Sequence, residues 1–453
     1  MKRILSSLIC LALCGAAAAQ QDAKTRLKQR LEWFQDQRFG LFLHWGAYSQ
    51  MGWFESWPLV WADRKWSNPS IQTREQMVEF RKTYFALNRT FNPTAFDPAD
   101  WAKAAKRAGM KYVVFTTKHH DGFSMFDTRM TDYRVTAPDC PFSKNPRANI
   151  AREVFDAFRK EGFGIGAYFS KSDWHSPYYW NPDTFAEDRN PNYDTLAQPE
   201  RWAKFVSFVH GQIRELMTGY GRIDILWLDG GQVRPPKQDI QMDKLAAMAR
   251  GFQPDLIMVN RNARDNYEDY RTPEQEVPDK PLGYVWESCI TMGKQWSYKP
   301  DDQYKTAREL IHLLVNVVSK GGNLLLNIGP GPDGRLPAAA LSRLEEIGDW
   351  MAVNAEAIHG TRPIAPYKTG QVAFTRKGKT VYAIYMAAEG ESGLPSRIEL
   401  SGLTLAPGTP VRLLGSDRTL RSGRDGETSV IEVPQGLRRS APGKYAWVFR
   451  FTI

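Results

Sequence analysis

Residues 223–229 read Ile223-Asp224-Ile225-Leu226-Trp227-Leu228-Asp229, an apolar run with the character of a buried strand that ends in a carboxylate. Three other apolar runs are also followed by polar groups. Residues 39–43 precede His44, residues 112–115 lead to His119 and His120, and residues 256–260 precede Arg261. The C-terminal ends of parallel barrel strands meet on one face, so these side chains are expected to share a pocket. The pattern predicts an enzyme whose chemistry lies at the strand ends.

The segment from about residue 30 to residue 360 alternates strand-like runs with helical patterns, which is typical of an α/β fold with a parallel sheet. We therefore expect a (β/α)8-like (TIM) barrel over residues 25–360. The count reaches about eight strands only if a weak run at Tyr284 to Trp286 is included, so a distorted barrel also fits the pattern. One helix is clearly marked, because Asp97 can cap it, Pro98 suits its first position and Gly109 ends it.

Residues 361–453 have a different sequence pattern, in which apolar residues alternate with period two and glycine is frequent. We expect a C-terminal β-sandwich domain there, with strands at 380–385, 397–400, 411–414, 429–433 and 445–453. No concentrated cluster of candidate catalytic groups falls in this segment, so a structural or accessory role is favoured over independent sugar binding.

The N-terminus has the order of a secretory signal peptide over residues 1–19: Lys2-Arg3, an apolar stretch from Ile4 to Leu13, then small residues from Ala16 to Ala19. The apolar stretch is shorter than the roughly 20 residues that span a bilayer, which disfavours a membrane anchor. The prediction is export to the periplasm or the medium. A lipoprotein form through Cys14 is the less favoured alternative, because Leu13 precedes that cysteine.

The formal charge of +10 comes from basic residues that are scattered among acids, which disfavours a nucleic-acid partner. Cys10 and Cys14 lie in the predicted signal, and only Cys140 and Cys289 would remain in an exported chain. The sequence leaves open whether these two pair or stay as thiols.

Asp229 is the sharpest catalytic candidate, because Gly230-Gly231 leaves room for a ligand beside its carboxylate. The alternative is an aspartate that caps the next helix, a common task after a strand. Here Pro235-Pro236 delays that helix. Position alone does not separate the two roles.

His44, His119 and His120 could be metal ligands, proton-transfer groups or hydrogen-bond donors to a polyhydroxylated substrate. Adjacent residues in a strand point to opposite faces, so His119 and His120 can both reach one pocket only if the strand ends between them. Their spacing disfavours a metal site and favours sugar contact.

Aromatic residues gather in two loops expected over the strand ends, where rings can stack on sugars: Trp53, Phe54, Trp57, Trp61 and Trp66 in one, and Trp174, Tyr178, Tyr179 and Trp180 in the other. Glycoside hydrolysis also needs two carboxyl groups. Glu55, Glu274 and Glu287 are the candidate partners for Asp229, and spacing does not select among them.

Together these segments resemble the α-L-fucosidases of glycoside hydrolase family 29. The matching stretches run through most of the expected barrel: Phe39 to Gly46, Glu55-Ser56-Trp57, Thr116 to Phe123, Leu226 to Gly230 and Lys320 to Pro330. The resemblance implies a (β/α)8-like domain followed by a β-sandwich, a retaining mechanism, and no metal or other cofactor. The implied partners are fucosylated oligosaccharides or glycoconjugates, with no membrane span.

The resemblance also implies roles for single residues. Asp229 matches the family nucleophile, and Glu274 is the chosen acid/base, with Glu287 as the alternative. The implied substrate contacts are His44, Glu55, Trp57, His119, His120, Tyr168, Trp227, Arg261 and Glu287. A non-catalytic carbohydrate-binding protein and a metal-dependent barrel hydrolase are the competing hypotheses.

Overall fold

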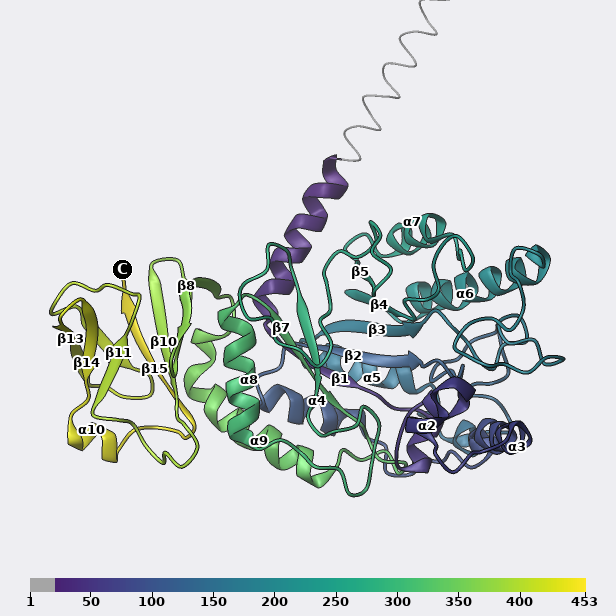
Figure 1. Ribbon diagram of the computed structural model, residues 1–453, viewed down its shortest axis with the longest axis horizontal. Coiled ribbons are helices and arrows are strands. Elements are labelled where there is room, and N and C mark those ends of the chain that lie inside the picture. The colour runs from purple at the N-terminus through teal and green to yellow at the C-terminus, as the bar shows by residue number, and fades with distance from the viewer. Residues whose placement is uncertain (1–20) are drawn as a thin grey trace, which may run out of the picture.

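The structure, a computed structural model, describes residues 21–453. The predicted signal peptide at residues 1–19 lies outside the described residues. An N-terminal helix over residues 21–37 leads into an α/β part, and a β part follows it at the C-terminal end (Figure 1). None of the helices over residues 21–453 is long and apolar enough to cross a membrane.

The α/β part is built on a parallel sheet of seven strands in the order β5-β4-β3-β2-β1-β7-β6. All its strands are buried along nearly their whole length, as expected for parallel strands covered on both faces. Their bounds are β1 Phe39–Leu43, β2 Tyr112–Lys118, β3 Gly164–Ser170, β4 Ile225–Asp229, β5 Ile257–Asn260, β6 Glu287–Thr291 and β7 Asn323–Ile328.

Helices cover the outside of the curled sheet, and α8 packs on α9, α9 on α4, α4 on α5 and α6 on α7. The predicted helix start is confirmed in α4, where Asp97 Oδ1 accepts a hydrogen bond of 3.0 Å from the Ala99 N–H and Pro98 is the first residue. The bounds are α2 Arg64–Ser67, α3 Arg74–Phe85, α4 Pro98–Arg107, α5 Ile150–Lys160, α6 Pro199–Gly219, α7 Met242–Phe252, α8 Ala307–Ser319 and α9 Ala338–Asn354. Short 3₁₀ helices lie at Ala47–Met51, Trp57–Leu59, Trp61–Asp63, Ala86–Arg89, Pro141–Lys144 and Ala355–Ala357.

The barrel is open between β5 and β6, which confirms the distorted form of the expected (β/α)8-like fold. No strand forms at Tyr284 to Trp286; β6 begins one residue later, at Glu287. The connecting segment 261–286 contains three prolines, which cannot donate to a strand ladder, and its strand-like pairing is limited to isolated bridges such as Glu274 to Cys289. An irregular segment therefore stands where an eighth strand would close the sheet.

The C-terminal part has eight antiparallel strands in the order β11-β14-β13-β12-β15-β10-β9-β8, and they fold around a core in a sandwich-like manner. The bounds are β8 Arg362–Thr369, β9 Val372–Lys377, β10 Thr380–Met386, β11 Arg397–Leu400, β12 Pro410–Leu413, β13 Thr419–Asp425, β14 Thr428–Glu432 and β15 Ala446–Thr452, with a short helix α10 Gln435–Arg439. Five of these strands fall in predicted runs, whereas β8, β9 and β13 were missed.

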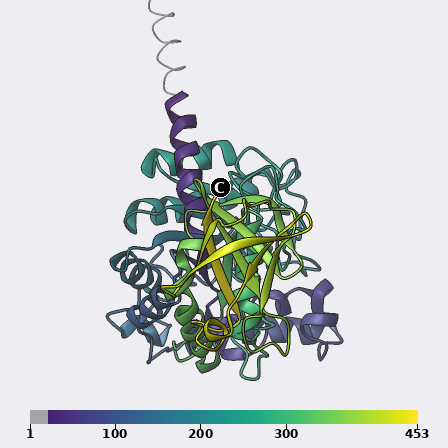
Figure 2. The ribbon, with the colours of Figure 1, turned by 90° about the vertical axis from the view of Figure 1, so that its left-hand side faces the viewer.

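The two parts are joined through α8 and α9, which lie against the C-terminal sheet; Figure 2 looks onto that sheet with the α/β part behind it. The Trp350 Nε1–H in α9 donates to the carbonyl of Ala446 at 2.8 Å. At the bottom of the barrel, the buried Arg38 guanidinium donates to the carbonyls of Gly321, Gly322 and Thr361. The hydrogen bonds of Arg38 thus connect the starts of β1 and β7 to the segment that joins the two parts.

The barrel interior leaves no room for a side chain at Gly40, which faces the ring of Tyr112. A Cβ atom at Gly40 would lie 2.4 Å from Cζ of that ring. Tyr112 cannot easily move, because it is fully buried and its hydroxyl donates to Glu287 Oε2 at 2.6 Å.

We expect Gly40→Ala to lower the free energy of unfolding by about 1–3 kcal/mol, because the methyl group overpacks a rigid site. Urea denaturation followed by circular dichroism measures the change. The matched control is Gly251→Ala in α7, where an added Cβ meets no atom within 4 Å. That variant should be neutral or more stable by up to about 1 kcal/mol, and equal effects at both positions would contradict the packing argument.

Candidate active site

A cavity of about 290 Å³ opens at the C-terminal ends of the barrel strands. Ten of the predicted site residues line it: His44, Glu55, Trp57, His119, His120, Tyr168, Trp227, Asp229, Arg261 and Glu274. Three strands deliver such a residue at or directly after their last position, since His44 follows β1, Asp229 ends β4 and Arg261 follows β5. The structure therefore brings together side chains that are up to 230 residues apart in the sequence, between His44 and Glu274.

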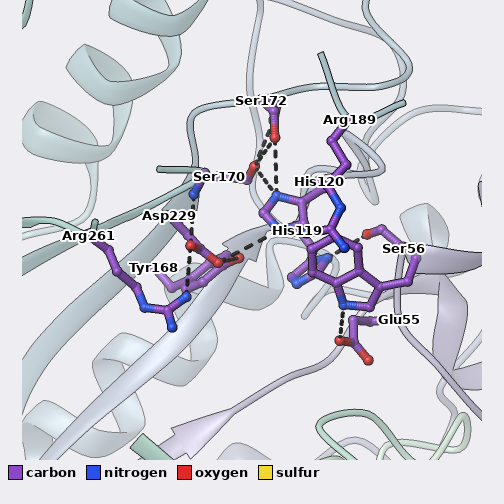
Figure 3. Close-up of polar contacts among 12 residues, drawn as sticks. Glu55, Ser56, His119, His120, Tyr168, Ser170, Ser172, Arg189, Asp229 and Arg261 are labelled. Atoms are coloured by element: carbon purple, nitrogen blue, oxygen red, sulfur yellow. Dashed lines mark hydrogen bonds and ion pairs between the residues drawn. The ribbon is translucent and has the colours of Figure 1, made fainter. Parts of the chain in front are cut away.

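Asp229, the last residue of β4, is held by three donors (Figure 3). Its Oδ2 accepts from the Tyr168 hydroxyl at 2.8 Å, and its Oδ1 accepts from the Gly230 N–H at 2.8 Å and from Arg261 Nη1 at 3.2 Å. Burial acts to raise the pKa of Asp229, but the Arg261 charge and these hydrogen bonds outweigh it and hold the pKa well below its usual range. The carboxylate is therefore ionised near pH 7 and takes up a proton only in strongly acidic solution. The alternative role as a helix cap is absent, because α7 begins only at Met242.

Arg261 joins this carboxylate to a second one. Its Nη1 donates to Asp229 and its Nη2 donates to Glu274 Oε2. The Glu274 side chain is 41% exposed, whereas that of Asp229 is 15% exposed. One carboxyl thus lies deep in the cavity, and the other lies at its mouth in contact with solvent.

The three histidines meet at one wall of the cavity, because β2 ends at Lys118 and leaves His119 and His120 free to turn to the same side. Each Nδ1 has a partner in the protein: Asn327 Oδ1 at 2.7 Å for His44, Ser56 Oγ at 2.5 Å for His119 and Ser170 Oγ at 2.6 Å for His120. Burial lowers the pKa of His44 and of His120 to about 4, and that of His119 well below its ordinary value. All three imidazoles are therefore neutral near pH 7.

No group of three or more His, Cys, Asp or Glu side chains within residues 21–453 has the arrangement of a metal site. The Nε2 atom of His120 lies 3.7 Å from Asp229 Oδ2, in a pair that faces the cavity. The ring centroids of His119 and His120 are 4.4 Å apart. The available nitrogen atoms are thus placed to contact a polar organic ligand.

Glu55 and Trp57 form a second polar wall. The Trp57 Nε1–H donates to Glu55 Oε1 at 2.7 Å, while Glu55 Oε2 is buried and has no hydrogen-bond partner among the described residues. Burial raises the pKa of Glu55 to about 7. The Arg189 guanidinium lies over the Trp57 ring, 4.3 Å from its centroid, and is fixed by two hydrogen bonds to Asp63. Glu55 therefore offers an unused oxygen to a ligand.

Glu287 does not line the cavity, so the expectation that it contacts substrate or acts as the acid/base is not met by this geometry. It is the first residue of β6, and its fully buried carboxyl accepts from the Tyr112 hydroxyl at 2.6 Å and from the Trp227 Nε1–H at 3.1 Å. Its side chain points into the barrel interior below Trp227. Burial raises the pKa of this carboxyl to about 7.

Several cavity residues were not predicted from the sequence: Phe42, Arg189, Gln232, Asn262, Cys289 and Trp296. Phe42 could have been found, because it lies two positions before His44 and so shares its face of β1. Arg189, Gln232 and Trp296 come from irregular loops that carry no periodic signal. Most of the predicted loop aromatics do not reach the cavity; Trp174 and Tyr179 are buried, and Trp66 is 48% exposed to solvent.

The two cysteines of the described residues are both buried and unpaired. Cys140 belongs to the core around α4 and α5, whereas Cys289 lines the cavity. Burial raises the pKa of the Cys140 thiol to about 11 and that of the Cys289 thiol above its ordinary value. Both are therefore protonated thiols, which are poor nucleophiles.

Known proteins share this architecture. A family model described as Alpha-L-fucosidase matches residues 12–356. Tissue alpha-L-fucosidase from Homo sapiens is 28% identical over 93% of this chain and 88% of its own length. Among solved structures, alpha-L-fucosidase isoenzyme 1 from Paenibacillus thiaminolyticus has 31% identity and a TM-score of 0.75 over 94% of this chain and 99% of that chain. The Thermotoga maritima alpha-fucosidase in complex with fucose has 28% identity and a TM-score of 0.74 over 93% of this chain and 96% of that chain.

The buried carboxyl of Glu287 should make stability depend on pH. The pKa of Glu287 is about 7 in the folded chain and about 4.5 when unfolded. The stabilisation that its protonated carboxyl adds to the free energy of unfolding is therefore complete below pH 4.5 and is lost as the pH rises through 7. We expect Glu287→Gln, which cannot ionise, to gain about 2–3 kcal/mol relative to the unsubstituted protein between pH 5 and pH 8.5. Urea denaturation at several pH values measures the difference.

The control for this comparison is Glu276→Gln, an exposed acid in the same stretch of chain. Its free energy of unfolding should keep a constant offset from that of the unsubstituted protein at every pH. A constant offset for Glu287→Gln as well would show that Glu287 does not change its ionisation inside the barrel.

Proposed function

Because the chain belongs to the alpha-L-fucosidase family, a family of glycoside hydrolases, we propose that it releases terminal α-L-fucose from glycans by a retaining double displacement. The single observation that carries the mechanism is the pair of carboxyls that share the Arg261 guanidinium. Retention needs one carboxylate as nucleophile and one carboxyl as acid and then base. Asp229, buried and ionised, suits the first role, and Glu274, at the solvent-facing mouth, suits the second.

In the first displacement, Asp229 attacks the anomeric carbon while the bond from that carbon to the leaving oxygen breaks. Glu274 gives its proton to that oxygen, and a glycosyl ester of Asp229 remains. In the second displacement, Glu274 takes a proton from water, the water oxygen attacks the anomeric carbon, and the ester bond breaks. The ion pair between Arg261 and Glu274 matches the stage of the reaction after Glu274 has given its proton to the leaving oxygen.

The dimensions and lining of the cavity support an exo-acting enzyme. A cavity of about 290 Å³ is slightly smaller than the roughly 300–1,000 Å³ of most ligand pockets, which suits a single sugar ring. The imidazoles and the unused Glu55 oxygen offer partners for ring hydroxyls. The ring of Phe42 adjoins those of Trp227 and Trp296, with centroid distances of 5.3 Å and 6.1 Å, and the three rings provide an apolar surface for the methyl group of fucose.

The proposed natural substrates are fucosylated oligosaccharides or glycoconjugates. Export to the periplasm or the medium stays a prediction from residues 1–19, and it would bring the enzyme to such extracellular glycans. A non-catalytic sugar-binding protein would need no pair of carboxyls, so the arrangement of Asp229 and Glu274 favours the enzyme.

Asp229→Ala should lower kcat for nitrophenyl α-L-fucoside by roughly three orders of magnitude or more, because it removes the nucleophile. Glu274→Ala should also lose activity, and azide should restore part of it by giving fucosyl azide with the stereochemistry of the substrate. Glu276→Ala, two positions away and exposed, should behave like the unsubstituted enzyme.

Each outcome tests a separate claim. No turnover by the unsubstituted protein would favour the binding-protein alternative, and loss of turnover with a chelator would favour the metal-dependent alternative. Near-normal activity of Asp229→Ala would refute its role as nucleophile. NMR of the first-formed sugar should show the α-anomer. Release of the β-anomer would refute the retaining mechanism but not the fucosidase activity.

Arg261→Leu should move the acidic limb of the kcat/KM profile to higher pH. The guanidinium holds the pKa of Asp229 low, so without it the carboxylate gains its proton at a higher pH as the solution is acidified. An opposite charge at this distance lowers a pKa by roughly 1–3 units, which sets the expected size of the shift. Arg271→Leu, an exposed arginine that stacks on Tyr284 outside the cavity, is the control with an unmoved limb.

A further inference from the structure

The hydrogen bonds behind the three histidines determine which ring nitrogen of each carries the proton. The Ser56 hydroxyl already accepts from the Asp121 N–H at 3.0 Å. Ser56 is fully buried, and among the described residues the only acceptor within reach of its proton is His119 Nδ1, at 2.5 Å. Ser56 therefore donates to His119 Nδ1, and the proton of this neutral imidazole must lie on Nε2. His119 thus presents an N–H donor to the cavity.

His44 has the opposite tautomer. The Asn327 side chain has a fixed orientation, because its Nδ2–H donates to the carbonyl of Trp296 at 2.7 Å. A flipped amide would set two oxygen atoms against each other at that distance. Asn327 Oδ1 therefore accepts from His44 Nδ1–H at 2.7 Å, and Nε2 of His44 presents a lone pair.

His120 is fixed in the same sense as His44. The Ser170 hydroxyl lies 2.8 Å from the carbonyl of Ser172 and 2.6 Å from His120 Nδ1. A carbonyl oxygen can only accept, and Ser172 is fully buried, so the Ser170 hydroxyl proton goes to the carbonyl of Ser172. The Ser172 hydroxyl lies 3.1 Å from Ser170 Oγ and 3.2 Å from His120 Nδ1. Because Ser170 Oγ and His120 Nδ1 are only 2.6 Å apart, a proton must lie between them, so His120 Nδ1–H donates to Ser170 and the Ser172 hydroxyl donates to Ser170 as well. Nε2 of His120 therefore presents a lone pair, 3.7 Å from Asp229 Oδ2 (Figure 3).

We propose that Ser56, Asn327 and Ser170 are positioning residues that fix one donor, at His119, and two acceptors, at His44 and His120, on the histidine wall of the cavity. Resting on the proposed function, this pattern specifies the ligand: a polyhydroxylated ring that accepts a hydrogen bond from His119 and donates hydroxyl protons to His44 and His120. A ligand hydroxyl that donates to His120 Nε2 also places a proton between the lone pair of that nitrogen and the Asp229 carboxylate. A ring with the wrong hydroxyl geometry leaves at least one buried nitrogen without a partner, which disfavours its binding.

NMR of the whole protein with ¹⁵N-labelled histidine tests the assignment without any substrate. At pH 7 the expected spectrum has a protonated Nδ1 for His44 and His120 and a protonated Nε2 for His119. Signals are assigned by single replacements such as His119→Gln. A protonated Nδ1 on His119, or a protonated Nε2 on His44 or His120, would overturn the proposal.

Ser56→Ala tests the link to catalysis. Without the hydroxyl, His119 should no longer favour the Nε2–H form, and kcat/KM for nitrophenyl α-L-fucoside should fall roughly tenfold or more. Ser56→Thr keeps a hydroxyl and should recover both the tautomer and most of the activity. The matched control is Ser49→Ala, a buried serine of a nearby 3₁₀ helix whose hydroxyl donates to the carbonyl of Gly46 at 2.9 Å, and it should change neither.

The double variant separates an effect through His119 from a general loss of packing. If Ser56 acts through His119, Ser56→Ala should cost little further activity in a His119→Gln background. Equal losses in both backgrounds would refute that route. Failure of the proposed function would show differently: the unsubstituted protein would not hydrolyse fucosides, yet its spectrum would still report the tautomers.

Discussion

An ionised, mostly buried carboxylate in the cavity at the strand ends is the constraint around which this structure is organised. Burial of Asp229 is unfavourable for its charge, and Arg261 offsets that cost by direct contact. The guanidinium in turn lies 5.5 Å from the centroid of the Trp227 ring. The Trp227 indole is anchored by Glu287, whose carboxyl also receives the Tyr112 hydroxyl. The side chains that fill the barrel therefore hold Arg261, and through it the Asp229 carboxylate, at the C-terminal ends of the strands.

The gap in the barrel belongs to the same arrangement. A closed eighth strand between β5 and β6 would place its side chains alternately inward and outward along a regular ladder. The irregular segment 261–286 instead bridges at Glu274 to Cys289 and brings Glu274 beside Arg261 at the solvent edge. An acid/base must reach both a leaving group and a water molecule, so a place on an open, partly exposed segment suits that role better than a buried strand.

The sequence predicted best those features that a regular strand imposes. His44, Asp229 and Arg261 could be located because each ends a clear apolar run, and parallel strands bring such ends together. Glu287 was misjudged because the strand was expected at residues 284–286 and begins at Glu287 itself. A carboxyl expected in a loop beyond a strand thus points into the barrel. Arg189 and Trp296 come from loops whose paths depend on tertiary contacts, and β8, β9 and β13 have too little alternation to stand out. Glu274 was supplied by the family resemblance, since spacing did not separate it from Glu55.

The neutrality of the imidazoles has a consequence for the nucleophile. A histidine cation beside Asp229 would add a second strong opposite charge and make the carboxylate less reactive toward an electrophilic carbon. Burial lowers the pKa of His120 to about 4, so Arg261 is left to balance the charge while the histidines act through oriented N–H groups and lone pairs. Neutral groups discriminate between hydroxyl arrangements through geometry, because a mismatched partner leaves a buried polar atom unsatisfied. The residues that orient them, Ser56, Asn327 and Ser170, do not line the cavity, so substitutions there could alter sugar selectivity while every residue of the cavity wall stays the same.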